Sequence, residues 1–584
     1  MEVIFLYISK EQIYKEKQKL YQKHIFPINY LKYHKYLKKV KHTNQKFIQE
    51  NINNPIFDNV NGYSLDEEQR KIILKDEDAL IIAGAGTGKT LTIIGKIIYL
   101  VKKGIPQSEI LCLSLTNDAC DNINDRCKKH KLGVKAVTFH KLSLNILKHN
   151  GIKYICSTDD SLKDIIHRMT YFNNKTLKLY TQNIFVSFNN KGLTKNDKDI
   201  YLLQKHIFFA SNLYINLKNK IHRFITIFKS NNMSSVDFDY FIKDASRELN
   251  LPKRKATTNF LALTKNIYKR YNDNLSTQNK IDFNDMINLA LGTIKTANIK
   301  KYKYIIVDEY QDISPTKCEL LKALKAKTGA KIIAVGDDFQ SIYKFTGSNL
   351  KPFLDFKTYF PYSETFFLNK TYRNSQNLLD ISGNFIMKNP HQIKKELASD
   401  KENLSPINIY YYDKDIKEVI EKVIYDLPKG TVMFLGRNNK DIKDIKLSKQ
   451  NIKYLTVHKS KGLESDSVII TNLINKVDGF PSRVELDDVF KYVTELKEEY
   501  PYAEERRLFY VALTRTKNSN YLLVNKQNPS IFVEELLENK NVTIKANPTP
   551  CSGCGTTLYY KVKDKALYYE CKKCQKLTKT HQNS

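Results

Sequence analysis

A glycine-rich segment between an apolar run and a helical pattern constrains the fold of this 584-residue chain most strongly. The run Ala79–Ala83 predicts a buried strand, and the helical pattern begins at Lys89. The segment between them is Ala83-Gly84-Ala85-Gly86-Thr87-Gly88-Lys89-Thr90, which fits G-x-x-x-x-G-K-[ST] with Ala83 at the first glycine. Glycines let backbone N–H groups surround a phosphate, and the helix N-terminus adds its positive end. We therefore predict a nucleotide site in which Lys89 reaches the β- and γ-phosphates and Thr90 ligates Mg²⁺.

Two carboxylates follow a second apolar run. The run Tyr304–Val307 predicts a strand, and Asp308 and Glu309 come directly after it. Alone, such a pair is more often a solvated turn. Together with the phosphate-binding loop, it indicates that Asp308 holds Mg²⁺ and that Glu309 polarises the attacking water.

Apolar runs and helical patterns alternate along most of the chain. Besides the two strands above, we predict strands near residues 109–115, 134–139, 331–335, 407–412, 431–435 and 467–471. Residues 151–278 are Lys-rich and helical without a strand signal, so an inserted helical domain is expected. Two interpretations of this inserted domain are open. It contacts duplex or displaced DNA, or it is a solvated helical face that only packs on the core. Several αβ units predict parallel sheets with the ligand site at the strand C-termini.

The charge balance favours a polyanionic partner. Lys+Arg total 95 and Asp+Glu total 62, which gives +33. Codon bias of an AT-rich genome is the alternative source of the lysines. Only 13 of the 95 basic residues are arginine, so each arginine suggests a need for a planar guanidinium. No apolar run approaches the ~18–20 residues of a membrane span, and we expect no signal peptide. A cytoplasmic, nucleoid-associated protein is therefore expected.

Four cysteines near the C-terminus have the spacing of a structural zinc site. The pairs Cys551/Cys554 and Cys571/Cys574 are each C-x-x-C, which is typical of four-thiolate zinc. Free thiols are the alternative. Aromatic runs at 558–560 and 567–569 predict two short strands of a zinc ribbon, and nearby lysines predict a nucleic-acid-binding surface.

Further motifs occur in a fixed order and carry a resemblance to a known family. They lie at residues 65–70, 114–119, 138–140, 282–286, 308–312, 335–343, 369–373, 456–464 and 504–515. In this order they resemble the superfamily 1 DNA helicases of the UvrD/Rep type, closest to helicase IV-like members, over about residues 57–525. The C-terminal cysteines are similar to topoisomerase zinc ribbons.

The resemblance implies an α/β fold with two RecA-like P-loop NTPase domains and a helical insertion in the first. Only about twenty residues separate Arg437 from Thr456, so no sizeable 2B domain is expected. The expected organisation is a basic helical extension at 1–60, domain 1A at 61–150 and 279–354, insertion 1B at 151–278, domain 2A at 355–545 and a zinc ribbon at 546–584.

The resemblance also assigns roles around ATP. Arg373 and Arg515 are expected to be arginine fingers on the γ-phosphate, and Gln340 its sensor. Gln69 and Arg70 resemble the adenine-reading motif, Tyr372 would stack on adenine, and Glu464 would lie near the ribose. Arg506 and Arg507 are interpreted as surface ion pairs with Glu504 or Glu505.

For single-stranded DNA, the resemblance implies contacts from eight residues, with bases stacking on aromatic rings such as Phe139 and Phe345. The eight are Thr116, Asn117, Phe139, His140, Tyr343, Phe345, Thr456 and His458.

The expected function is an ATP-dependent 3′→5′ DNA helicase or single-stranded DNA translocase in repair, recombination or replication. ATP, Mg²⁺ and structural Zn²⁺ are the expected cofactors, and single-stranded DNA and 3′-tailed duplex DNA the expected partners, with repair proteins as further candidates. One alternative is an ATPase that binds RNA polymerase and clears stalled complexes, which the lack of long coiled-coil arms disfavours. Another is a binding protein with an inactive ATPase, disfavoured because the motif residues are present.

Overall fold

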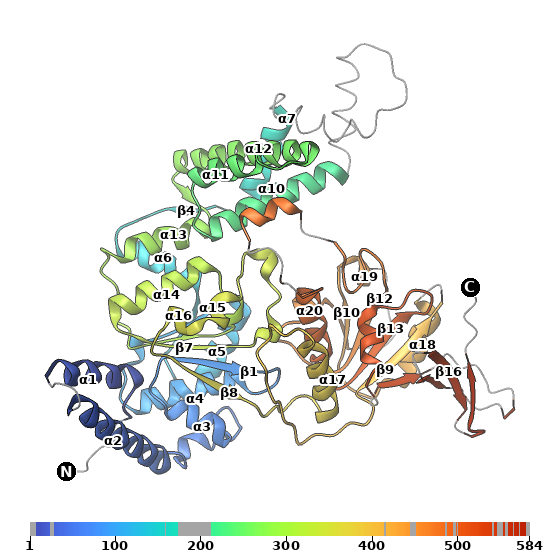
Figure 1. Cartoon of the computed structure of the whole chain (residues 1–584), viewed down its shortest axis with the longest axis horizontal. Coiled ribbons are helices and arrows are strands. Elements are labelled where there is room, and N and C mark those ends of the chain that lie inside the picture. The colour runs from blue at the N-terminus through green and yellow to red at the C-terminus, as the bar shows by residue number, and fades with distance from the viewer. Residues whose placement is uncertain are drawn as a thin grey trace.

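The computed structural model contains two parallel αβ units, a helical insertion, an N-terminal helical pair and a small C-terminal sheet (Figure 1). It describes residues 7–23, 28–157, 159–172, 212–413, 416–443, 445, 451–484, 487–494, 498, 500–539, 542–545, 553–554, 559–563, 566–571 and 573–579.

The first αβ unit is built on a six-stranded parallel sheet of order β3-β2-β6-β7-β1-β8. Its strands are β1 (Ala79–Ala83), β2 (Ile110–Ser114), β3 (Ala136–Thr138), β6 (Tyr304–Val307), β7 (Lys331–Gly336) and β8 (Glu364–Leu368). The inner strands are nearly continuous apolar runs because helices cover both faces of the sheet. All the strands predicted here from sequence are confirmed to within about two residues at each end.

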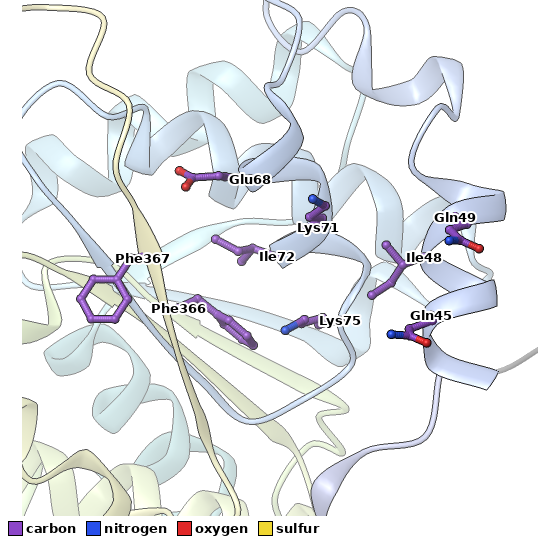
Figure 2. A pocket seen from close by; sticks show the side chains of 9 residues that line it. All are labelled: Gln45, Ile48, Gln49, Glu68, Lys71, Ile72, Lys75, Phe366 and Phe367. Carbon is purple, nitrogen blue, oxygen red and sulfur yellow. The ribbon is translucent and has the colours of Figure 1, made fainter. Parts of the chain in front are cut away.

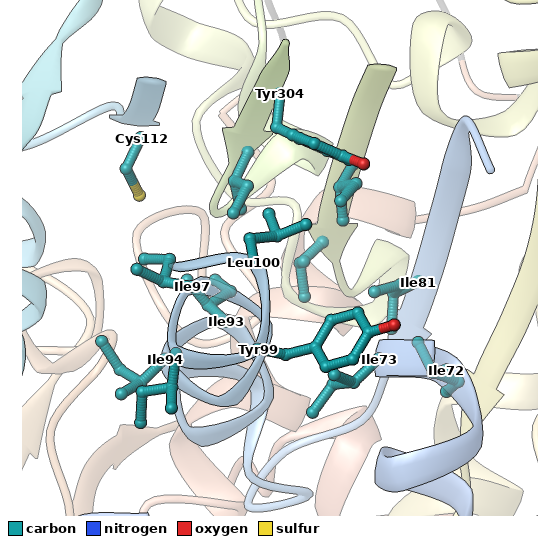
Figure 3. Close-up of a cluster of buried hydrophobic side chains, with 14 of the residues drawn as sticks. Ile72, Ile73, Ile81, Ile93, Ile94, Ile97, Tyr99, Leu100, Cys112 and Tyr304 are labelled. Atoms are coloured by element: carbon teal, nitrogen blue, oxygen red, sulfur yellow. The ribbon is translucent and has the colours of Figure 1, made fainter. Parts of the chain in front are cut away.

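Helix α4 (Lys89–Lys102) anchors the glycine-rich loop to this sheet. Ile93, Ile97 and Leu100 are fully buried among side chains from β1, β6 and β7 (Figure 3). Full burial of each such side chain contributes about 1.5–3 kcal/mol. The loop between β1 and α4 is therefore held at both ends by rigid elements.

The strand β8 corrects the expected domain boundary. We placed residues 355–545 in the second domain, but Glu364–Leu368 pairs with β1 along its whole length. The first sheet therefore extends to Leu368. The short run Thr365-Phe366-Phe367-Leu368 gives only a weak strand signal in the sequence. In the structure, Leu368 is its one fully buried residue. Beside this edge strand, α2 (Ile28–Asn51), α3 (Glu67–Leu74) and β8 line an open pocket of about 440 Å³ (Figure 2).

The second αβ unit contains a six-stranded parallel sheet of order β11-β10-β12-β13-β9-β14. Its strands are β9 (Ile407–Tyr412), β10 (Val432–Gly436), β11 (Ile452–Thr456), β12 (Ser465–Leu473), β13 (Thr516–Asn525) and β14 (Val542–Lys545). Helices α17 (Gln376–Met387) and α20 (Ala503–Leu513) pack on one face and α18 (Lys417–Asp426) on the other. The connection from Gly436 to Ile452 is short, and its described part contains only the one-turn helix α19 (Lys440–Lys443).

The helical insertion has its own aromatic core. Its described helices are α7 (Asp159–Phe172), α10 (Asn212–Ser230), α11 (Ser235–Ala245) and α12 (Leu251–Thr277). Phe224, Phe228 and Phe238 are fully buried between them. Phe490, from the second αβ unit, packs into the same core, 6.0 Å from the Phe224 ring. The insertion is therefore attached to both αβ units, since β4 (Ile155–Cys156) and β5 (Lys280–Ile281) join it to the first.

The two ends of the chain carry small elements. Helices α1 (Lys10–Lys23) and α2 (Ile28–Asn51) confirm the helical interpretation of the N-terminal extension. At the C-terminus, β15 (Tyr559–Lys563), β16 (Ala566–Cys571) and β17 (Lys576–Lys579) form an antiparallel sheet, one strand more than predicted. In the part of the chain that the structure describes, no helix combines the length and apolarity of a membrane span.

Candidate nucleotide and nucleic-acid site

The phosphate-binding loop turns sharply between β1 and α4. Gly86 and Gly88 have φ angles of 75° and 82°, in the left-handed region that favours glycine. A Cβ atom on Gly86 would lie 2.5 Å from the Cβ of Arg373, which belongs to a segment approaching from the second αβ unit. Only glycine therefore lets the loop and this segment meet.

Lys89 is a buried cation in this loop that lacks a hydrogen-bond acceptor among the described residues. Its Nζ lies 4.0 Å from Oε1 of Glu309, too far for a hydrogen bond. A buried ammonium without an acceptor is costly unless an anion binds to it. The arrangement therefore fits a phosphate group at Lys89, with Thr90 partly exposed beside it.

Asp308 and Glu309 lie where β6 ends. Burial, followed by repulsion from Glu309, raises the pKa of Asp308. Burial alone would also raise the pKa of Glu309, but Lys89 and Lys461 together lower it. Glu309 adopts a left-handed φ of 53°, and Nε2 of Gln311 donates to its Oε2 at 2.5 Å. Glu309 is thus an ionised, oriented carboxylate, and Asp308 is a carboxylate that gains from a nearby Mg²⁺.

Lys461 brings the second αβ unit into direct contact with these carboxylates. Its Nζ bonds to Asp312, donates to the carbonyl of Gln340 at 2.8 Å and lies 3.4 Å from Oε2 of Glu309. Burial opposes its charge, but Asp312 and Glu309 raise its pKa to about 12. The motif at 456–464 predicts no role for Lys461, because nothing in the sequence pairs it with residues about 150 positions away.

Gln340 joins groups from both units. Its Nε2 donates to Asp337 at 2.6 Å, and its Oε1 accepts from Arg515 at 3.1 Å. Arg515 is 1% exposed, and burial, with repulsion from Arg373, lowers its pKa to about 9. A buried guanidinium next to another arginine gains from an anion between the two.

Arg373 and the residues before it contact the phosphate-binding loop. The Oγ1 of Thr371 donates to the carbonyl of Ala85 at 2.8 Å, and the amide of Tyr372 donates to that of Gly86 at 2.9 Å. Arg373 itself donates to Glu464 at 2.9 Å. The structure therefore brings Tyr372, Arg373 and Glu464 to the nucleotide loop.

The three residues expected to contact adenine differ in their surroundings. Gln69 is buried, and its Nε2 lies 3.3 Å from the carbonyl of Thr87 in the loop. Tyr372, 45% exposed, donates from its hydroxyl to Asp66 at 2.6 Å. The contacts of Arg70 do not support the role we expected for it. Its guanidinium donates to Leu65, Ile52, Asp58 and Ser64, so it braces the preceding segment.

The interpretation of Arg506 and Arg507 as surface ion pairs is wrong. Both are nearly fully buried, with exposures of 3% and 2%. Arg506 pairs with Glu535, and Arg507 pairs with Glu498 and donates to the carbonyl of Ser341. Helix α20 is packed so that both arginines are buried, and their partners are Glu535 and Glu498 rather than neighbours on the helix. Helical spacing in the sequence does not reveal such partners.

A buried lysine that we did not predict lies behind Gln340. Lys395 is a cation between Asp337 and Asp338, and its Nζ lies 3.5 Å from the centre of the Phe339 ring. It fixes Asp337, which in turn accepts from Gln340. Its sequence context, Lys394-Lys395-Glu396, looks like ordinary surface charge and carries no signal of burial.

The residues expected to contact DNA lie at strand C-termini of both units. Thr116 and Asn117 are exposed at the start of α5 (Asn117–Lys129), after β2. His140 lies at the start of α6 (Phe139–His149), after β3. Burial, with Lys317 nearby, lowers the pKa of His140 to about 4, so its ring is neutral at pH 7.

An aromatic cluster crosses from the first unit to the second. The Phe345 ring lies 5.2 Å from that of His458, edge to face, and Tyr343 donates to the carbonyl of His458 at 3.2 Å. Phe345 is 39% exposed, and burial, with Arg437 nearby, lowers the pKa of His458 to about 4. Thr456, at the end of β11, is buried just before it.

The expectation that bases stack on Phe139 is wrong for this structure. Phe139 is 1% exposed and packs in the core of the first αβ unit with Leu142 and Met286. An aromatic residue at the start of a helix is equally suited to a hydrophobic core and to stacking on a base, so the sequence did not distinguish these two environments. Phe345 presents an exposed ring face.

Together, a phosphate-binding loop on one parallel αβ unit and arginines from a second define a two-domain P-loop NTPase whose nucleotide binds between the units. The chain belongs to the UvrD/REP helicase family. The model of the UvrD/REP helicase N-terminal domain matches residues 65–361, and that of the UvrD-like helicase C-terminal domain matches residues 433–527.

Curated relatives agree with this assignment. DNA helicase IV of Escherichia coli is 28% identical over 82% of this chain and 71% of its own length. A probable DNA helicase of Mycoplasma pneumoniae is 25% identical over 79% of this chain and 83% of its own. ATP-dependent DNA helicase Rep of Buchnera aphidicola is 28% identical over 67% of this chain, and the match spans 56% of Rep.

Proposed function

We propose that this chain is an ATP-dependent DNA helicase or single-stranded DNA translocase that moves 3′→5′. One observation carries the proposal: three cations of the second αβ unit meet the motifs of the first. Lys461 lies 3.4 Å from Glu309, Arg515 bonds to Gln340, and Arg373 adjoins Gly86 of the phosphate-binding loop. Helicase names among the curated relatives support DNA as the substrate.

The geometry supports a mechanism in which ATP joins the two units. Lys89 and the loop amides bind the phosphates, Glu309 accepts the proton of the attacking water, and Arg373 and Arg515 stabilise charge on the γ-phosphate. Mg²⁺, held by Thr90 and Asp308, would neutralise the phosphate oxygens. Because Arg373 and Arg515 of the second unit bind a γ-phosphate held by the first, loss of that phosphate removes an attraction between the units and lets them part.

Strand polarity gives a direct test. We expect the chain with ATP to unwind a duplex that has a 3′ single-stranded tail and to leave a 5′-tailed duplex intact. The measurement is strand separation on the two substrates with identical duplex sequence. Equal unwinding of both, or unwinding of the 5′-tailed substrate alone, would contradict the proposed polarity.

Phe345 is proposed to stack on a base of the bound strand. We expect Phe345→Ala to weaken binding of a short thymidine oligonucleotide about tenfold, because base stacking contributes about 1–3 kcal/mol. Fluorescence anisotropy measures this affinity. Phe367→Ala is the control, since Phe367 is equally exposed, at 38%, but lies on the edge strand β8. The same loss in both variants would show that Phe345 has no special role.

We further propose that Cys551, Cys554, Cys571 and Cys574 hold a structural zinc ion in a ribbon at 546–584. Cys551 lies outside the described residues, and only the backbone of Cys571 is described. Among the described side chains, no group of three or more potential ligands is gathered. Support comes from the donor set and from Gln575, whose φ of 54° closes a tight turn directly after Cys574.

Zinc content tests this proposal. We expect about one zinc per chain by elemental analysis, and we expect Cys554→Ser with Cys574→Ser to abolish it, because a small ribbon needs its metal to fold. Cys156→Ser, an exposed cysteine elsewhere, is the control. A purified chain without zinc that retains protease resistance of residues 546–584 would contradict the proposal.

The remaining expectations stay proposals. Domain roles 1A, 1B and 2A are proposed for the first αβ unit, the helical insertion and the second αβ unit. A role in repair, recombination or replication and a partnership with repair proteins are proposed on family grounds alone. The RNA polymerase alternative is not favoured, because the relatives carry the names of DNA helicases.

A further inference from the structure

The N-terminal helices α1 and α2 form a lysine-rich pair that the nucleotide and single-strand sites do not use. In their 14 and 24 residues they carry eleven lysines and three glutamates, a net charge of +8. The whole 584-residue chain carries +33. About a quarter of the net charge thus lies in about one fifteenth of the residues, a concentration that a genome-wide bias toward lysine does not explain.

Most lysines of α2 are arranged along one face. Lys35, Lys38, Lys39, His42 and Lys46 follow the spacing i, i+3, i+4, i+7, i+11, and all five are exposed. The opposite face packs into the core through Val40 and Phe47. From Lys32 to Lys46 the row of positive charge is about 20 Å long.

This row is kept at some cost in stability. Within the described part of the chain, Lys35, Lys38 and Lys39 form no ion pair. Like charges at i, i+4 destabilise a helix by about 0.2–0.5 kcal/mol per pair. A polyanion that binds along the row would relieve this repulsion.

The helical pair is fixed rigidly to the first αβ unit. The backbone amide of Lys10 donates to Glu77 at 2.9 Å, and its Nζ lies 2.8 Å from Glu364. The Asn44 side chain bonds to both backbone groups of Ile8, at 2.7 and 2.9 Å, which joins the two ends of the pair. Exposed lysines on such a platform keep their relative positions when a partner binds.

The pair lies away from the motor site. Glu77 and Glu364 are at the beginnings of β1 and β8, whereas the phosphate loop and the residues expected to contact single-stranded DNA follow strand ends. In Figure 1, α1 and α2 lie on the side of the first αβ unit that faces away from the second. A partner bound there can coexist with a strand held across the two units.

We propose that the exposed face of α2 is a second nucleic-acid site that binds the backbone of double-stranded DNA. Duplex DNA presents rigid rows of phosphates, one charge per about 1.7 Å of axis, which suit a rigid row of lysines. Single strands are instead bound by stacking of bases on aromatic rings, and between Lys35 and Lys46 the only exposed ring is the imidazole of His42, since Tyr36 is half-buried. The lack of arginine on α2 fits contacts to phosphates rather than to base edges.

The inference rests on the proposed function, because a translocase on one strand meets duplex DNA as its substrate. The test uses the full chain with Lys35→Gln, Lys38→Gln and Lys39→Gln together. The matched control is Lys429→Gln, Lys453→Gln and Lys476→Gln, three exposed lysines of the second αβ unit. The probe is a blunt 30-base-pair duplex, titrated over a range of salt concentrations.

We expect the α2 variant to lose at least tenfold in duplex affinity at low salt. The slope of log K against log salt should shrink by about two to three, since each lost phosphate contact removes about 0.9. Stimulation of ATP hydrolysis by a short single-stranded oligonucleotide should stay within twofold of the unmodified chain. The control variant should keep the duplex affinity.

Three results would overturn the inference. They are duplex binding by the α2 variant that equals that of the control, an equal loss in both variants, and a matching loss of affinity for single-stranded DNA. Failure of the proposed function is a separate result, namely an unmodified chain whose ATP hydrolysis ignores single-stranded DNA. The duplex titration is interpreted independently of that outcome.

Discussion

Replacing Glu309 by Gln should lower DNA-stimulated ATP hydrolysis by about 10²–10⁴-fold, the usual contribution of a general base. Glutamine keeps the shape of the side chain and its contact with Gln311 but does not accept a proton at neutral pH. Lys89 and Lys461 hold the pKa of Glu309 low against burial, so the carboxylate is ionised at neutral pH. Steady-state phosphate release with saturating single-stranded DNA measures the effect.

Glu319→Gln is the control for this variant. Glu319 lies on α14 (Pro315–Thr328), pairs with Lys322 and is 47% exposed, so its loss should leave the rate unchanged. Binding of a fluorescent ATP analogue should persist in Glu309→Gln, because the phosphate loop is intact. Retention of more than about a tenth of the activity would exclude Glu309 as the base.

Arg515→Lys should lower the same rate by about 10³-fold, the lower end of the range for arginine fingers. Lysine retains a positive charge but loses the planar fork that reaches Gln340, Leu463 and Val511 at once. Because Arg515 holds Gln340 across the cleft, the variant should also uncouple ATP binding from closure of the two units. ATP hydrolysis and ATP affinity measured side by side separate these effects.

Arg483→Lys serves as the matched control, since Arg483 is exposed in the same unit. Thermal unfolding shows whether the buried lysine has disturbed the fold. A well-folded Arg515→Lys chain with near-normal hydrolysis would mean that Arg515 is structural and that Arg373 alone contacts the γ-phosphate.

The sequence was sufficient for the elements that carry a local signal. The glycine-rich loop, the strand before it and the carboxylates after β6 were predicted because loop geometry and strand burial constrain neighbouring residues directly. The resemblance then placed Arg373, Arg515 and Gln340, and the structure brings all three to one cleft.

Features that depend on distant packing were not predicted. Lys395 and Lys461 look like surface lysines, yet each is buried between carboxylates contributed by another part of the chain. Phe139 was expected to face DNA, but the sheet and α6 enclose it. The strand β8 was not predicted because its apolar run, Phe366–Leu368, is only three residues long and carries a weak strand signal.

The most direct measurement of the central claim is ATP hydrolysis by the full chain with no nucleic acid, with single-stranded DNA and with single-stranded RNA. We predict slow hydrolysis without nucleic acid and strong stimulation by single-stranded DNA, because a DNA strand bound across Thr116, His140 and Phe345 favours the closed cleft. A rate that is indifferent to DNA, or stimulated by RNA in its place, would contradict this claim.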